Sequence, residues 1–303
     1  MSPVDPVNPK SEDDLSSERP RLHDIAFRML GSSLEAERAV DQTVARWRRA
    51  QKADPHAIAA RRDLLTEILA RTCVDILRQA RDGHDRYLGG WLPEPIPHPR
   101  AETRQILADP VDRISLDESL NMLLLVVLES LTPEQRVAFI LHDVFGVPFW
   151  GIADVVGRSP DDARELARSA RRQIQQRRKH EVPQEHHRSI VMELLGGCTA
   201  RAEDRVRAIL HPDITVLIDN GGRVNSAPSP VRGVDEAARL LIGVVTGVPG
   251  MTVSEQSVNG QTGLVFRQAS RVVGVLSVNI KADNIVDTWI VLNPDKLRAW
   301  NTD

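Results

Sequence analysis

Apolar residues recur at helical spacing in two blocks within the first 180 residues of the chain. Between residues 21 and 82, three successive runs place apolar side chains three or four positions apart, so that each run has one apolar face. Between Thr132 and Arg172 the runs are shorter, and there are again three of them. The pattern predicts a packed three-helix block followed by three short helices.

Capping residues divide the second block into helices joined by tight turns. The first helix is opened by an N-cap and a proline and closed by glycine, over Thr132–Gly146. The second runs over Pro148–Val156 and is stopped by Gly157, after which Ser159 provides the N-cap of the third. Two short helices joined by a glycine turn are typical of a helix-turn-helix.

Strand patterns dominate the last third of the chain. Runs rich in β-branched residues, bounded by Gly or by Asp/Asn turns, predict strands at 214–218, 263–268, 271–280 and 285–292. Helical spacing predicts helices at 190–195, 203–210 and 235–242. The segment 282–284 is a suitable hairpin turn between the last two strands. We expect an α+β domain in which helices cover one face of a curved antiparallel sheet.

Composition limits the partners and the compartment. The chain has 303 residues and a formal net charge of -3, so affinity for nucleic acid must come from local patches. Its two cysteines, Cys73 and Cys198, lack metal-like spacing and suggest a reducing compartment without a disulfide framework. No run is long and apolar enough to span a bilayer, and residues 1–20 are polar instead of resembling a signal peptide. We expect a cytoplasmic protein.

The exposed side of the last predicted helix in the second block is cationic. Arg164, Arg168 and Arg171 fall at positions i, i+4 and i+7, opposite the apolar face. Guanidinium groups bind phosphate oxygens and the O6/N7 edge of guanine, so the sequence predicts a helix that enters the major groove of DNA. A solvated charged face on an ordinary helical bundle is the alternative. Asp161 and Asp162 suit the helix dipole but would repel phosphate.

Several short strings in the chain resemble one protein family. Ile25–Gly31, Glu35–Glu37 and Arg46-Trp47 are similar to region 2 of extracytoplasmic-function sigma factors, and the helix-turn-helix block resembles region 4 of that family. The linker string Trp91–Pro95 and the later string Asn293–Leu297 resemble the subgroup that carries a SnoaL-like C-terminal extension. The resemblance extends over almost the whole chain.

The resemblance implies a multidomain chain with two all-α sigma domains followed by an α+β SnoaL-like domain of the cone-shaped barrel type. Its expected parts are a disordered tail at 1–20, region 2 at 21–83, a Pro/Gly-rich linker at 84–114, region 4 at 115–180, a linker at 181–188 and the SnoaL-like domain at 189–303. Asp219–Arg223 resembles the glycine turn of the subgroup, with Asn220 at a position where a further glycine is usual.

The linker and the C-terminal domain are expected to meet. Trp91 is large and apolar, and a linker alone cannot bury it, so a neighbouring domain is its natural partner. Contact between the two matching strings would couple the linker to the domain and so regulate activity. The residues assigned to this coupling are Trp91, Leu92, Pro93, Glu94, Pro95, Asn293, Pro294, Asp295, Lys296 and Leu297.

The resemblance also implies two sets of macromolecular contacts. Residues assigned to docking on core RNA polymerase are Glu35, Glu37, Arg38, Asp41 and Gln42. Residues assigned to promoter DNA are Arg78 and Arg81 in region 2, and Arg158, Ser159, Arg164, Glu165, Arg168, Arg171 and Arg172 in region 4. Three departures weaken the match. Arg38 replaces an acid of the family, Asp82 and Asp85 dilute the positive charge after Arg78, and the Phe149-Trp150-Gly151 string replaces an acidic pair.

An isomerase or cyclase activity is the third class of function to weigh. Proton transfer needs a carboxylate base together with a hydroxyl or a neutral acid, yet the single tyrosine, Tyr87, lies outside the SnoaL-like domain. The other available acids and bases, which have ordinary structural roles, are His211, Asp213, Asp219 and Asp287. We therefore expect no catalysis, no metal and no cofactor.

The sequence as a whole predicts an alternative sigma factor that binds core RNA polymerase and promoter DNA, is regulated by its C-terminal domain and has no membrane partner. A degenerate sigma-like regulator that binds DNA without initiating transcription is the alternative. The occupancy of the C-terminal domain by a small-molecule ligand is left open.

Overall fold

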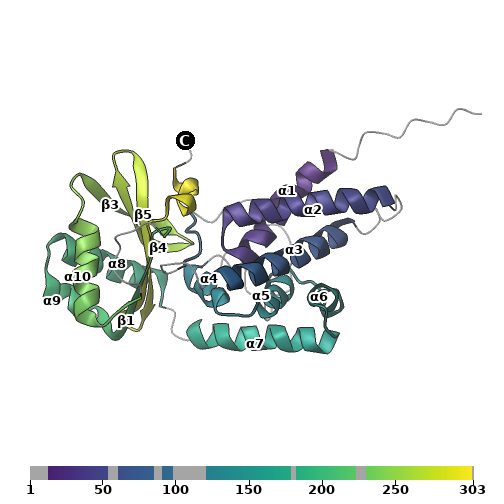
Figure 1. Cartoon of the computed structure of the whole chain (residues 1–303). Helices are drawn as coiled ribbons and strands as arrows, with labels where there is room; N and C mark the ends of the chain where they lie inside the picture. The colour runs from purple at the N-terminus through teal and green to yellow at the C-terminus, as the bar shows by residue number, and fades with distance from the viewer. Residues whose placement is uncertain are drawn as a thin grey trace, which may run out of the picture. The chain divides into compact units, whose positions relative to one another are not determined.

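The computed structural model describes residues 13–53, 61–84, 91–97, 121–178, 182–222 and 230–301 (Figure 1). The chain divides into two compact units, and each is described by itself. The first unit joins residues 1–80 to residues 133–168, and the second joins residues 81–132 to residues 169–303. These units differ from the predicted domains, because the core of the helix-turn-helix block groups with the first helical block.

Three helices form the start of the first unit, as the apolar periodicity predicts. They are α1 (Asp13–Leu30), α2 (Ser33–Ala53) and α3 (Arg61–His84). Helix α1 begins within the predicted tail, which is therefore wrong for residues 13–20. The reason is that Leu15 is 4% exposed and extends the apolar face of α1 toward the N-terminus. Residues 1–12 of that tail lie outside the described residues.

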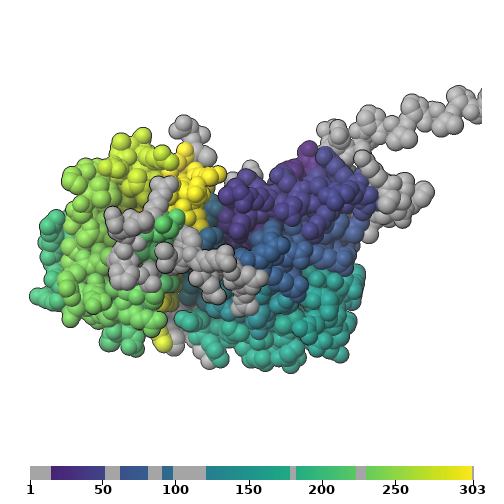
Figure 2. Space-filling model, in the orientation of Figure 1, coloured from purple at the N-terminus to yellow at the C-terminus, as the bar shows by residue number. Residues whose placement is uncertain are grey.

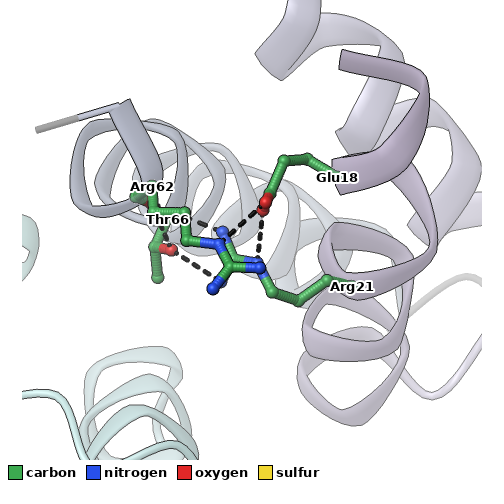
Figure 3. A network of polar contacts seen from close by, with 4 residues as sticks. All are labelled: Glu18, Arg21, Arg62 and Thr66. Atoms are coloured by element: carbon green, nitrogen blue, oxygen red, sulfur yellow. Dashed lines mark hydrogen bonds and ion pairs between the residues drawn. The ribbon is translucent and has the colours of Figure 1, made fainter. Parts of the chain in front are cut away.

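A polar network fastens α1 to α3 (Figure 3). The Glu18 carboxylate accepts hydrogen bonds from Arg21 Nε at 2.6 Å and from Arg62 Nε at 2.8 Å, and Arg21 Nη1 donates to Thr66 Oγ1 at 3.1 Å. Burial alone would raise the pKa of Glu18, but the hydrogen bonds from Arg62 and Arg21 outweigh burial and lower it. The carboxylate therefore stays ionised and links the two helices.

The predicted helix-turn-helix block is confirmed as a set of short helices. It comprises α5 (Pro133–Phe139), a π-helical turn at Ile140–Val144, α6 (Phe149–Val156) and α7 (Pro160–Arg178). Gly157 ends α6 with φ of 69°, a left-handed conformation that favours glycine. Within the first unit, the first helices, in purple and blue, and the teal helices of this block form one continuous surface (Figure 2). A further short helix, α4, spans Met122–Glu129 in the second unit.

Most of the second unit is an α+β domain in which helices cover one face of a six-stranded sheet (Figure 1). The strand order is β2-β1-β6-β5-β4-β3. The helices are α8 (Gln184–Thr199), α9 (Glu203–Ala208) and α10 (Val234–Thr246). The strands are β1 (Leu210–Asp219), β2 (Val231–Arg232), β3 (Met251–Val258), β4 (Gln261–Gln268), β5 (Arg271–Lys281) and β6 (Asn284–Val291).

The sheet is mixed, so the expectation of an antiparallel sheet is wrong at one position. Strands β1 and β6 pair in parallel, with Val216 opposite Thr288 and Ile218 opposite Ile290. The chain between them contains α10 and three further long strands, and such a long connection permits parallel pairing, whereas a short hairpin does not. The hairpin predicted at 282–284 is confirmed, because Lys281 pairs with Asn284.

Helix α8 begins inside the predicted linker 181–188. His187 is 4% exposed, and its Nε2 lies 3.3 Å from the Val278 carbonyl oxygen of β5. Together with Ile190, Val191 and Leu194 it forms the buried side of α8. The linker assignment is therefore wrong from residue 184 onward, since the buried face of this helix already includes His187.

Candidate nucleic-acid interface and linker contacts

A reciprocal cap positions α7, the last helix of the helix-turn-helix. Ser159 Oγ accepts from the Asp162 N–H at 3.1 Å, and Asp162 Oδ2 accepts from the Ser159 hydroxyl at 2.7 Å and from its N–H at 3.3 Å. Hydrogen bonds from the hydroxyl and then the backbone of Ser159 lower the pKa of Asp162. Asp162 therefore has a structural role at the helix start, as the capping pattern predicts.

The arginines predicted to bind DNA are paired with acids of their own helix. Arg164 Nη1 lies 2.8 Å from Asp161 Oδ1, and Arg168 Nη1 lies 3.1 Å from Glu165 Oε2. The two arginine side chains are 52% and 56% exposed. Exposed ion pairs of this kind contribute about 0.2–1 kcal/mol, so a phosphate can replace the carboxylate at little cost.

The other predicted DNA-binding residues of this block lie on or beside α7. Arg158 and Ser159 are exposed in the turn before the helix, Arg172 is exposed on it, and Arg171 is half-buried. The same face thus offers arginines over several turns of α7, which matches the charge requirement of a groove-binding helix.

Aromatic residues at the start of α6 lie beside this arginine row. The Phe149 ring stacks on His142 with 3.9 Å between ring centroids, and the Arg164 guanidinium carbon lies 5.3 Å from the Phe149 centroid. Trp150 is 66% exposed. Phe149 therefore supports Arg164, and the neighbouring Trp150 indole is open to solvent.

Four of the five residues assigned to polymerase docking are exposed on α2. Glu37, Arg38, Asp41 and Gln42 are exposed, whereas Glu35 is half-buried. The Asp41 carboxylate lies 2.6 Å from Arg19 Nη2 of α1, and both side chains are substantially exposed. The structure brings these residues onto one helix, and an intramolecular cation partly neutralises the acidic face.

Arg78, assigned to promoter melting, contacts the helix-turn-helix block instead of facing solvent alone. Its Nε and Nη2 donate to Glu134 Oε1 of α5 at 3.0 Å and 2.6 Å. Arg71, about two turns earlier on α3, donates to the Asp154 carbonyl oxygen of α6 at 3.2 Å. Arg81 belongs to α3, but its side chain lies outside the described residues.

The two strings expected to meet are joined in the second unit by a buried lysine. Lys296 Nζ donates to Asp219 Oδ2 at 2.6 Å and to the Leu92 carbonyl oxygen at 2.5 Å. The ammonium also lies 3.1 Å from the centroid of the Trp91 ring. Lys296 is 4% exposed and Asp219 is 0% exposed, so this is a desolvated ion pair. We call Trp91, Leu92, Asp219 and Lys296 the linker clasp.

Further hydrogen bonds hold the rest of the linker string. Leu92 N–H donates to Asp219 Oδ2 at 3.2 Å, and Trp300 Nε1 donates to the Pro95 carbonyl oxygen at 2.7 Å. The Ile96 N–H donates to Asn259 Oδ1 at 3.1 Å, and the Asn259 N–H donates to the Ile96 carbonyl oxygen at 2.9 Å. Leu92, Pro93, Glu94 and Pro95 are all buried. The linker string is therefore part of the fold of the second unit.

The glycine turn and the second string fit closely together. Gly221 has φ of 72°, and a Cβ atom there would come within 2.9 Å of Asn293 Oδ1. The same oxygen accepts from the Asp295 N–H at 3.1 Å and caps the short 3-10 helix Pro294–Lys296. Leu297, directly after it, is 1% exposed. Glycine at 221 therefore permits the approach that carries Lys296 to Asp219.

The candidate acids and bases are engaged in local structure. His211 Nδ1 accepts from the Asp213 N–H at 3.1 Å, and Asp287 Oδ2 accepts from Asn279 Nδ2 at 2.8 Å. Cys73 and Cys198 are buried and free, and burial raises the pKa of the Cys198 thiol to about 12. Among the described residues, no three His, Cys, Asp or Glu side chains could hold a metal ion together.

Sequence reasoning missed several partners of these groups. The pairing of Glu134 with Arg78 and the bonds from Trp300 and Asn259 to the linker join residues far apart in the chain. Only Trp300 gave a sequence signal of a hydrogen-bond partner, since an indole N–H normally has a partner when the ring is buried.

For the part of the chain that the structure describes, no helix is long and apolar enough to cross a membrane.

Comparison with known proteins places the chain among relatives of similar length. No protein-family model matches it. It is 33% identical over 290 residues to the ECF RNA polymerase sigma factor SigJ of Mycobacterium tuberculosis, covering 92% of this chain and 90% of SigJ. It is 30% identical over 305 residues to the probable ECF RNA polymerase sigma factor SigI of the same species, covering 99% of this chain and 98% of SigI.

The crystal structure of SigJ has the same architecture. It superposes with a TM-score of 0.68 at 28% sequence identity, and the match covers 95% of this chain and 98% of SigJ. The expected fold, two all-α sigma domains followed by an α+β SnoaL-like domain, is thereby confirmed. Sequence identity over nine-tenths of its length, the confirmed helix-turn-helix and the shared architecture together show that the chain belongs to the extracytoplasmic-function RNA polymerase sigma factors.

Proposed function

We propose that this chain is an alternative sigma factor that binds core RNA polymerase and directs it to particular promoters. The observation that carries the proposal is the exposed arginine row on the last helix of a helix-turn-helix, in a chain of this family. Arg164 and Arg168 are suited to guanine edges and phosphates of the upstream promoter element. Arg171 and Arg172 add charge farther along the same helix.

Region 2 supplies the contacts with polymerase and with the melted strand. Glu37 and Asp41 present carboxylates on the exposed side of α2, where they suit a basic surface of the polymerase. Glu35 is half-buried and contributes less to such a surface. Arg78, with Arg81 beyond it on α3, is suited to the phosphates of a displaced single strand.

The SnoaL-like domain regulates this activity by holding the linker. The linker clasp fixes residues 91–97 on the domain, so the path of the chain between region 2 and region 4 is set by the domain. The distance between two DNA-binding modules determines whether both promoter elements can be engaged at once. No reaction and no cofactor are needed for this role.

The competing functions have less support. A SnoaL-like isomerase or cyclase needs a convergent acid-base pair. Here His211 accepts a hydrogen bond from the Asp213 backbone, whereas Asp219 and Asp287 are bound by Lys296 and Asn279. A degenerate regulator that binds DNA without initiating shares the same helices, so only a functional assay separates it from an initiating sigma factor.

Transcription with purified core polymerase tests the proposal. DNA that co-purifies with the chain, identified by sequencing, would serve as template for run-off transcription with the full chain. We expect transcripts that start at a fixed position and that need the chain. DNA that is bound but never transcribed by the complex would instead identify a degenerate regulator, and the absence of both binding and transcripts would contradict the proposed function.

A further inference from the structure

One arginine expected to bind promoter DNA is already engaged by a carboxylate. Arg78 donates two hydrogen bonds to the same oxygen of Glu134, which lies in the first turn of α5. Both residues belong to the first compact unit. The Arg78 side chain is 53% exposed and that of Glu134 is 22% exposed. The contact therefore lies at the rim of the packed helices, within reach of a strand of nucleic acid.

Two buried arginines join the first helices to the helix-turn-helix block near this rim contact. Arg28 of α1 is 1% exposed, and its guanidinium carbon lies 5.7 Å from the centroid of the Phe145 ring. Arg136 of α5 is 2% exposed and acts electrostatically on the Cys73 thiol of α3. Burial dominates at that thiol and raises its pKa. Because α1 and α3 are packed on the start of the helix-turn-helix block, the rim contact belongs to a defined interface.

We infer that Glu134 acts as a phosphate mimic that occupies Arg78 in the free chain and is displaced by a single strand of promoter DNA. A guanidinium binds a carboxylate and a phosphate with the same fork of N–H donors, so the two ligands compete for one group. The inference rests on the proposed role of Arg78 in strand capture. Its consequence is that the free chain binds single strands more weakly than its arginines alone would allow.

The strength of the contact suits reversible competition. An exposed ion pair changes an equilibrium by about twofold to fivefold. Several phosphate contacts acting together change the affinity for nucleic acid by orders of magnitude. Glu134 therefore lowers the affinity of the free chain without preventing promoter binding. Salt weakens both the ion pair and the phosphate contact, so the effect is largest at low ionic strength.

Glu134→Gln removes the negative charge and keeps the size of the side chain. Fluorescence anisotropy of a labelled single-stranded oligothymidylate with the full chain at low salt should show an affinity gain of about twofold to fivefold. Asp154→Asn is the matched control, because Asp154 is exposed on α6 and contacts α3 through its backbone carbonyl. A gain confined to Glu134→Gln supports the inference. Equal gains in both variants, or none, would overturn it.

A second pair of variants gives a larger effect. Glu134→Lys places a cation opposite Arg78 and should raise the affinity beyond the rise in Asp154→Lys, with circular dichroism checking that both remain folded. Arg78→Ala separates this inference from the proposed function. If Arg78→Ala weakens binding but neither Glu134 variant strengthens it, the role of Arg78 in binding the strand is supported. The inference that Glu134 mimics a phosphate is then refuted. If Arg78→Ala changes neither binding nor transcription, Arg78 is not a nucleic-acid contact and both fail.

Discussion

The ammonium of Lys296 lies 2.6 Å from a carboxylate oxygen of Asp219, and both side chains are almost completely removed from solvent. The desolvation cost of such a pair is offset only when the remaining hydrogen-bonding groups also have partners. Here the second carboxylate oxygen accepts from the Gly221 N–H at 3.0 Å, and the lysine also binds the Leu92 carbonyl oxygen. The pair is therefore satisfied on both sides, and its integrity depends on the linker remaining in place.

Lys296→Met should destabilise the second unit, because it leaves the Asp219 carboxylate buried without its cation. Loss of one partner of a buried pair costs about 3–5 kcal/mol, which urea unfolding of the full chain can measure. Lys281→Met, at an exposed lysine of β5, is the control and should cost far less. Adding Asp219→Asn to Lys296→Met should recover part of the loss, and a purely additive double variant would argue against the pair.

Trp91→Ala should change promoter output while both helical sigma regions stay folded. The substitution removes the ring that faces Lys296, a contact with a free energy of about 0.5–2 kcal/mol, and so loosens the linker from the domain. Run-off transcription and hydrogen exchange of residues 91–97 would report the two effects. Unchanged transcription at equal protein concentration, with a demonstrably loosened linker, would leave the domain without a regulatory role.

Arg168→Ala should weaken binding to promoter DNA. If Arg168 contacts a guanine edge, the loss should be about 1–3 kcal/mol and should be confined to one base position, as measured with a set of single-base variants of the site. Arg239→Ala, an exposed arginine on α10, is the control. An equal loss on every sequence would reassign Arg168 to a phosphate, and no loss would contradict the proposed docking of α7.

Arg38→Asp should tighten the complex with core polymerase. Arg38 is exposed beside Asp41 on α2, at a position where the resemblance to region 2 implies an acid, so the change adds negative charge to the proposed docking face. Titration of core polymerase into the fluorescently labelled chain measures the affinity of the complex. Arg48→Asp, farther along the same exposed side, tests whether any added acid has this effect. A weaker complex would show that Arg38 does not face a basic surface of core polymerase.

The stability of the second unit should fall as pH drops below the ordinary histidine range. Burial lowers the pKa of His187 below 6.5, partly offset by its hydrogen bond to the Val278 carbonyl, so the unfolded chain takes up the proton first. Stability is complete above about 6.5 and falls, between that value and the lowered pKa, by at most about 1.4 kcal/mol per pH unit. Urea unfolding across this range should show the pH slope in wild type and in the control His186→Gln, but not in His187→Gln.

Apolar spacing and capping residues predicted the helices well, but such local patterns do not predict which distant segments pair. The start of α7 could be predicted because Ser159 and Pro160 carry the capping information within four residues. Strand β3 was missed because polar side chains such as Glu255 and Gln256 interrupt it, and half-exposed strands give a weak pattern. The parallel neighbours β1 and β6 are separated in the chain by five other elements, so no local rule assigns them.

The same distinction applies to the sites. Exposure of Arg164 and Arg168 followed from their spacing on an amphipathic helix, and the structure agrees. The ion pairs of Arg78 with Glu134 and of Lys296 with Asp219 depend on tertiary packing, and their sequence separation hides them. Lysine is seldom buried, so the residue type at 296 predicts an exposed side chain, whereas Lys296 is buried.

Because the linker string is part of the fold of the second unit, the C-terminal domain cannot be moved to another protein without it. Pro97 forms an isolated β-bridge with Val258 of the edge strand β3, and Leu92 is 0% exposed, so residues 91–97 are packed on the domain. A fragment starting at residue 189 would lack these contacts and would present unpaired polar groups and apolar surface to other molecules. A gene fusion that moves this domain must therefore carry two separate segments, the linker string at 91–97 and the domain itself. The two segments are expected to be inherited together.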